Sequence, residues 1–123
     1  MIWIAKNNLG KVYRGKTQYI DKDTKPHRDY VVVKDNGKSV SVAKLKSIKK
    51  ENDKALLEID FKKYGLSKRT GIDYQRFSKN RLSGKPISLN DRKTFPEGRE
   101  RFKLSSHDTH KAIKHTEKKK KPR

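Results

Sequence analysis

A chain of 123 residues has room for one domain, and with 30% hydrophobic against 39% charged residues its core must be small. Without cysteine, neither a disulfide framework nor a thiolate zinc site can form. The apolar start at residues 1–5 is too short for a signal peptide, and no segment approaches the roughly 20 apolar residues of a membrane span. The sequence therefore predicts a cytoplasmic protein with no membrane partner.

The net charge is the strongest feature of the composition. Lys and Arg number 34 against 14 Asp and Glu, which gives a formal charge of +20. A compact chain with this charge repels itself unless a polyanion or an acidic partner neutralises it. Surfaces that charge merely keeps soluble carry both signs in mixture. The charge therefore predicts a nucleic-acid partner.

The first half of the chain is predicted to be β-structure. Residues 10–19 place β-branched and aromatic residues between glycines, which is typical of a curved strand. Pro26 favours an extended backbone that leads into residues 28–33, a valine-rich run expected to be a buried central strand. Asn36-Gly37 then lies between two β-rich runs, which predicts a type I′ hairpin that pairs residues 30–34 with residues 39–45.

Alternation in the second hairpin strand predicts which side chains face the core. Val40, Val42 and Leu45 are expected to point inward. Ser41 and Lys44, like Ser39, are expected to face water.

The second half of the chain is predicted to contain only short strands and helices. Residues 55–59 predict a strand, although Leu, Ala and Glu there would also suit a helical turn, and residues 60–66 predict a short helix closed by Gly65. Residues 70–77 alternate apolar and polar side chains and predict another strand. Ser106 is expected to cap a helix over about residues 107–116, whose few apolar residues make its helicity depend on docking.

These elements predict a mainly β fold of the small α+β class, an SH3-like open barrel with a short C-terminal helix. The barrel domain is expected over residues 1–104. Residues 105–123 are expected to supply the helix and a lysine-rich tail that is disordered in the free protein.

Several kinds of chemistry have no support in the sequence. The four histidines bring no third ligand near His107 and His110, so no metal is expected. Ser105, His107 and Asp108 are neighbours in sequence without the spacing of a catalytic triad, and helix capping explains them better. Phosphate-binding glycine motifs are absent as well, so no cofactor is expected.

Cations interleaved with aromatic residues favour RNA or another single strand, since Lys and Arg bind phosphates while aromatic planes stack on unpaired bases. Tyr30, Tyr74 and Phe77 are expected in the core, whereas Tyr13 and Tyr19 suit either role. DNA binding stays open. The candidate nucleic-acid-binding residues are Arg14, Lys16, Tyr19, Lys25, Lys44, Lys46, Lys68, Arg69, Arg76, Lys79 and Arg81.

The group Pro26-His27-Arg28-Asp29 stands where a loop meets the central strand. Cleavage of RNA through its own 2′-hydroxyl needs a base, an acid and a cation to hold the phosphate charge, and Arg and His with a hydroxyl supply these. In the alternative interpretation Arg28 pairs with Asp29 or another acid and His27 is merely exposed.

The chain joins GKVY at residues 10–13 to KPHRDYVVV at residues 25–33, and continues through residues 39–48 to GIDYQR at residues 71–76. Over about residues 9–90 this pattern resembles the PemK/MazF family, the endoribonuclease toxins of toxin–antitoxin pairs. The resemblance implies an SH3-like barrel, commonly a homodimer, that cuts single-stranded RNA without a metal and is held inactive by an acidic antitoxin. It makes Arg28 the catalytic arginine and Ser47 the hydroxyl that helps hold the scissile phosphate. With His27, which the group at residues 26–29 suggests, these are the candidate catalytic residues. The family usually has proline after this arginine, where this chain has Asp29.

Two other functions are open at this point. A non-catalytic accessory protein would use the same basic face only to bind nucleic acid. A factor that binds structured RNA, the ribosome or a protein would grip its partner with basic loops. The fold alone does not separate these functions.

Overall fold

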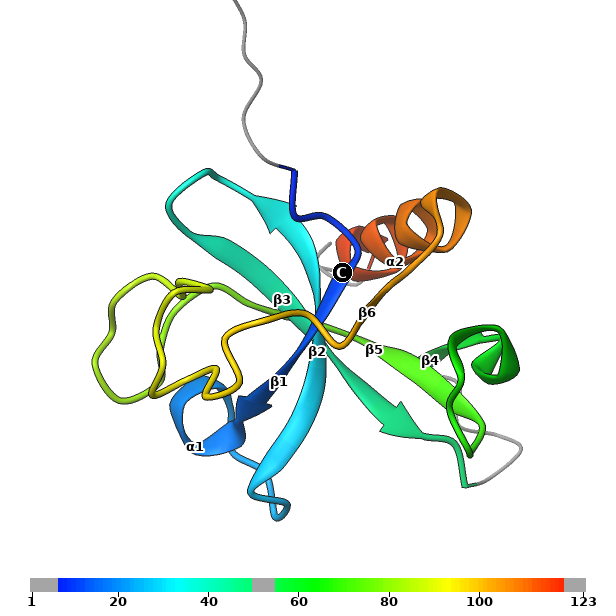
Figure 1. The fold of residues 1–123 in the computed structure, drawn as a ribbon, viewed down its shortest axis with the longest axis horizontal. Helices are drawn as coiled ribbons and strands as arrows, with labels where there is room; N and C mark the ends of the chain where they lie inside the picture. The colour runs from blue at the N-terminus through cyan, green and yellow to red at the C-terminus, as the bar shows by residue number, and fades with distance from the viewer. Residues whose placement is uncertain (1–6, 50–54, 119–123) are drawn as a thin grey trace, which may run out of the picture.

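A computed structural model describes residues 7–49 and 55–118, and the lysine-rich tail lies outside the described residues. Six strands form one antiparallel sheet in the order β4-β5-β3-β2-β1-β6, which curls through the molecule (Figure 1). This confirms the predicted fold class, a small α+β open barrel with one C-terminal helix. The elements are β1 (Lys11–Lys16), α1 (Thr17–Ile20), β2 (His27–Asp35), β3 (Val40–Ser47), β4 (Leu56–Ile59), η1 (Phe61–Tyr64), β5 (Thr70–Phe77), β6 (Phe102–Lys103) and α2 (Ser106–Lys118).

The β2–β3 hairpin is confirmed, with Tyr30 opposite Lys44 and Asp35 opposite Val40. The predicted type I′ turn is wrong, because Gly37 has a φ of 93° whereas no non-glycine residue in the described part of the chain has a positive φ. The chain instead makes a four-residue loop over residues 36–39. The Gly37 amide donates to Asp35 Oδ1 at 2.8 Å, so the aspartate side chain stabilises a turn that needs the left-handed conformation only at Gly37.

Both faces of the central sheet are covered, which corrects the prediction for β3. Ser41 is 2% exposed and Lys44 is 6% exposed, although both were expected to face water. Their polar atoms are bonded beneath the covering segments: Ser41 Oγ lies 2.6 Å from Ser78 Oγ, and Lys44 Nζ binds carboxylates. The inward positions Val40, Val42 and Leu45 are buried as predicted.

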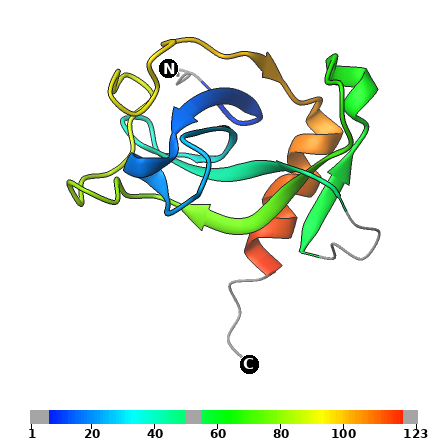
Figure 2. The same ribbon diagram turned by 90° about the horizontal axis from the view of Figure 1, so that it is seen from below.

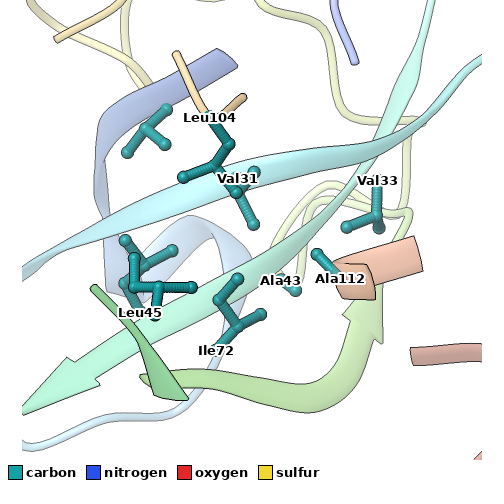
Figure 3. Close-up of a cluster of buried hydrophobic side chains, with 9 residues drawn as sticks. Val31, Val33, Ala43, Leu45, Ile72, Leu104 and Ala112 are labelled. Atoms are coloured by element: carbon teal, nitrogen blue, oxygen red, sulfur yellow. The ribbon is translucent and has the colours of Figure 1, made fainter. Parts of the chain in front are cut away.

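The first hydrophobic cluster joins the sheet to α2 (Figure 3). Ala112 is fully buried in it beside Val33 and Ala43, so the helix shares the core of the barrel. The helix N-terminus is capped by Ser105, whose Oγ accepts from the Asp108 amide at 3.2 Å, and not by Ser106 as predicted. No helix in the described ranges is long and apolar enough to cross a membrane.

The second cluster lies on the other face of the sheet. Tyr13 is buried there and packs edge to face against Phe95, with ring centroids 5.7 Å apart. Tyr30 is buried as expected. Tyr74 was expected in the core but is 38% exposed. The reason is an irregularity in pairing: Ala43 opposes Arg76 and Leu45 opposes Ile72, so three residues of β5 stand opposite one residue of β3 and the alternation breaks.

A substitution in β1 tests the packing of this second cluster. A Cβ added at Gly15 would lie 2.9 Å from Ile20 Cδ1 and 3.1 Å from Tyr30 Cδ1. We expect Gly15→Ala to lower the free energy of unfolding by about 1–3 kcal/mol, because the neighbours are buried and must move. Denaturant unfolding measures the change, with Gln18→Ala at an exposed position as the control. Equal stability of Gly15→Ala and the parent would contradict the packing described.

Candidate functional site

A pocket of about 150 Å³ opens where β2 begins and β3 ends. Because the two strands are antiparallel with Tyr30 opposite Lys44, the residues before Tyr30 lie beside those after Lys44. The structure thus brings together the three predicted catalytic residues. We call it the Arg28 pocket, and its lining residues are His27, Arg28, Asp29, Leu45, Lys46, Ser47, Leu66 and Thr70.

Arg28 is held by an acid from the loop that precedes β2. Its Nε donates to Asp23 Oδ2 at 2.6 Å, and its side chain is 15% exposed. Burial alone would raise the pKa of Asp23, but hydrogen bonds from Arg28, the Lys25 amide and Lys44 hold that pKa well below its usual range. Arg28 therefore does pair with an acid, as the alternative interpretation held, and that acid is Asp23 and not Asp29.

Lys44 belongs to the same ion network and not to the surface. Its Nζ binds Asp21 and lies 2.7 Å from Asp23 Oδ2. Burial opposes the charge of Lys44, but hydrogen bonds from its ammonium to the two carboxylates raise its pKa. A buried ammonium with two carboxylate partners is not placed to contact nucleic acid, so the prediction that Lys44 does so is wrong.

Asp29 was considered only as a partner of Arg28, but it also lines the pocket. Its Oδ1 is buried and accepts no hydrogen bond from the described residues, although Arg101 Nε lies 3.5 Å away. Burial raises the pKa of Asp29, and the charges of Arg101 and Arg14 only partly oppose this. Asp29 and His27 are two residues apart on β2, so they point to the same side of the strand. That spacing was the available signal for a second acid–base group.

The other wall of the pocket carries hydroxyl groups and a cation. Ser47 is exposed at the end of β3 and stands opposite Thr70 at the start of β5. Thr70 Oγ1 donates to the Lys68 carbonyl at 2.8 Å. Lys46, which is half-buried, also lines the pocket. Thr70 lies too far from Ser47 in sequence for the pair to be found without the register of β3 and β5.

Two other predicted nucleic-acid-binding arginines make structural contacts. Arg69 forms a two-pronged pair with Glu58, with both N···O distances 2.8 Å. Arg76 Nη2 donates to Thr116 Oγ1 of α2 at 3.0 Å, and its Nε is buried. Tyr19 lines a separate pocket of about 480 Å³. The remaining candidates are exposed at Lys25, Lys68, Lys79 and Arg81, and half-buried at Arg14 and Lys16.

Removing the charge of Asp29 is expected to stabilise the protein at neutral pH. The folded protein raises the pKa of this carboxyl, so it disfavours the charged form and stability falls as pH rises through the unfolded value of 3.8 and then the folded pKa. Asp29→Asn should therefore unfold at a higher temperature than the parent at pH 7, and the difference should shrink as pH falls from the folded pKa toward 3.8 and be absent below 3.8. Thermal unfolding across this range measures it. An Asp29→Asn variant less stable than the parent at pH 7 would contradict the unfavourable burial.

No group of three or more His, Cys, Asp or Glu side chains placed to hold a metal ion occurs within residues 7–49 and 55–118. In comparisons with known proteins, no family model matches the chain and no curated protein is significantly similar to it.

Proposed function

We propose that this protein binds single-stranded RNA and cleaves it without a metal, as a cytoplasmic endoribonuclease of the PemK/MazF type. The observation that carries the proposal is the Arg28 pocket, a small space whose lining residues include an arginine, a histidine, an aspartate, a serine and a threonine. Its volume of about 150 Å³ is below the ~300–1,000 Å³ of pockets that enclose whole ligands. It suits a phosphate group whose flanking nucleotides lie outside.

The proposed reaction uses only groups in this pocket and the RNA itself. The ribose 2′-oxygen attacks the adjacent phosphorus, the bond from phosphorus to the 5′-oxygen breaks, and a 2′,3′-cyclic phosphate and a 5′-hydroxyl result. A base takes the 2′-proton and an acid protonates the leaving 5′-oxygen. His27 and Asp29 supply this acid–base pair from one side of β2. Ser47, which lies level with His27, donates to a phosphate oxygen. Arg28 and Lys46 alternate with these residues and begin on the other side of the strands. In the proposal their long side chains reach the phosphate around the ends of β2 and β3 and stabilise its charge.

The proposal includes two protein partners. The formal charge of +20 suits an acidic antitoxin that covers the exposed lysines and arginines. A second copy of the chain would make the homodimer expected of the family. An acidic antitoxin would compete with RNA for the same cations, so its binding should weaken as salt rises.

The test is incubation of the purified protein with end-labelled single-stranded RNA in excess EDTA. We expect discrete fragments that end in a cyclic phosphate, because the attacking group is the 2′-hydroxyl. The matched control is the same strand with a 2′-deoxy sugar at the scissile nucleotide, which should be bound and left intact. Cleavage that requires an added divalent ion, or that persists with the deoxy sugar, would contradict the mechanism.

A second candidate function is RNA binding without cleavage, and one observation favours it. Asp23 Oδ2 lies 2.6 Å from Arg28 Nε, and this negative charge weakens the attraction of the Arg28 guanidinium for a phosphate. In that case the same experiment gives shifted complexes and no fragments.

A further inference from the structure

A second, larger pocket adjoins the Arg28 pocket. Its volume is about 600 Å³, and Leu66 lines both. An ion pair also joins them, since Arg101 of the larger pocket lies 3.5 Å from Asp29 Oδ1 of the smaller one. A strand whose phosphate lies in the Arg28 pocket therefore has the second pocket beside it.

The larger pocket is lined by side chains of the kinds that can bind an unpaired nucleotide, and its two aromatic residues also pack against the first hydrophobic cluster. The rings of Tyr64 and Phe102 are stacked, with centroids 5.6 Å apart and an interplanar angle of 27°. Arg99 is exposed and forms no ion pair within the described part of the chain. Aromatic planes stack on bases of any sequence, and an unpaired arginine attracts the phosphate between them.

The same pocket has acceptors for base N–H groups. Glu97 and Glu100 both line it, and Glu97 Oε2 lies 3.7 Å from Arg101. Carboxylates accept hydrogen bonds from exocyclic amines and ring N–H groups of bases but repel phosphates. The pocket thus combines acceptors and aromatic rings for a base with an exposed cation, Arg99, for a phosphate.

The fold holds this pocket in a defined shape. Figure 2 shows the gold segment that leads into β6 on the same side of the molecule as η1 and the start of α2. The Tyr64 hydroxyl donates to Asp108 and accepts the Ser105 amide at 3.0 Å, which ties its ring to the helix N-terminus. Side chains fixed in this way lose little conformational entropy when a ligand binds.

We propose that the pocket between η1 and β6 is a nucleotide subsite, which holds the base next to the scissile phosphate by stacking on Phe102 and the adjoining phosphate by Arg99. This inference rests on the proposed function and adds the path that the bound RNA takes across the surface. The residues that carry it, at positions 97–102, lie outside the stretch that resembles the PemK/MazF family.

The experiment places the fluorescent base 2-aminopurine at each position in turn of a single-stranded RNA whose 2′-hydroxyls are all methylated, so that none of them can attack a phosphate. Stacking on an aromatic ring quenches its emission, so we expect the full-length protein in EDTA to quench one position, next to the scissile phosphate. Phe102→Leu should abolish that quenching and weaken binding by roughly tenfold. Arg99→Ala should keep the quenching at saturation and reduce the slope of log affinity against log salt by about 1.

Lys111→Ala, which removes the same charge from an exposed position on α2, is the matched control and should leave the quenched position and its intensity unchanged. No quenching at any position, or equal quenching by Phe102→Leu, overturns the subsite. Cleavage of the all-ribose strand, assayed beside it, reports on the proposed function alone. Fragments without position-specific quenching would therefore reject the subsite and leave the ribonuclease, whereas quenching without fragments would leave a binding protein that has the subsite.

Discussion

Replacement of Arg28 by alanine is expected to slow RNA cleavage by about 10²–10³-fold, the loss typical of removing one group that stabilises charge in a transition state. Arg28 lines the pocket where β2 begins, and its Nε is fixed by Asp23 at 2.6 Å. A guanidinium oriented in this way can present its terminal nitrogens to a phosphate. Single-turnover cleavage of end-labelled RNA in EDTA measures the rate.

Two controls separate this effect from unfolding and from weaker binding. Arg28→Lys keeps the charge but loses the planar donor set, so we expect it to recover only part of the rate. RNA affinity, measured by gel shift on a strand with a 2′-deoxy sugar, should fall much less than the rate in either variant. An unchanged rate for a folded Arg28→Ala protein would remove Arg28 from the reaction.

Replacement of Asp23 by alanine is expected to destabilise the fold by about 3–5 kcal/mol, the cost of breaking a buried ion pair from one side. The Asp23 side chain is 7% exposed and binds Arg28 and Lys44 together. Without it, Lys44 keeps only Asp21 as a carboxylate partner in the described chain. Urea unfolding at pH 7 measures the loss, with Asp60→Ala, an exposed carboxylate, as the control.

The same network predicts a loss of stability in acid. The pKa of Asp23 is lowered in the folded protein, so its contribution is complete above the unfolded value of 3.8 and declines as pH falls below it. The parent should therefore lose stability below pH 3.8 more steeply than Asp23→Ala. Parallel acid-unfolding curves for the two proteins would show that Asp23 does not provide this stability.

The hairpin explains why much of the site could be predicted. Asn36-Gly37 identified the turn between β2 and β3, and antiparallel pairing then brings His27 and Arg28 level with Ser47. The turn type was wrong because a side chain, Asp35, stabilises the loop. Local patterns located the strands well, since valine-rich runs and turn residues are short-range signals.

The remaining residues depend on contacts that alternation does not reveal. Lys44 has the spacing of an outward residue, but the loop before β2 folds over it and brings Asp21 and Asp23 to its ammonium. In sequence those two aspartates are typical of a polar turn. Thr70 and Leu66 join the pocket only because β5 pairs with β3 across more than twenty intervening residues.

The position of β1 has a consequence for how the chain reaches this structure. β1 is paired on one edge by β2 and on the other by β6, where the Leu104 amide donates to the Gly10 carbonyl at 2.8 Å. β1 thus pairs with a strand that follows it far along the chain, and the loop that closes between them is long. Folds dominated by such distant pairings form slowly. During synthesis the hairpin can form early, while one edge of β1 and the face that α2 covers stay open until β6 and α2 emerge.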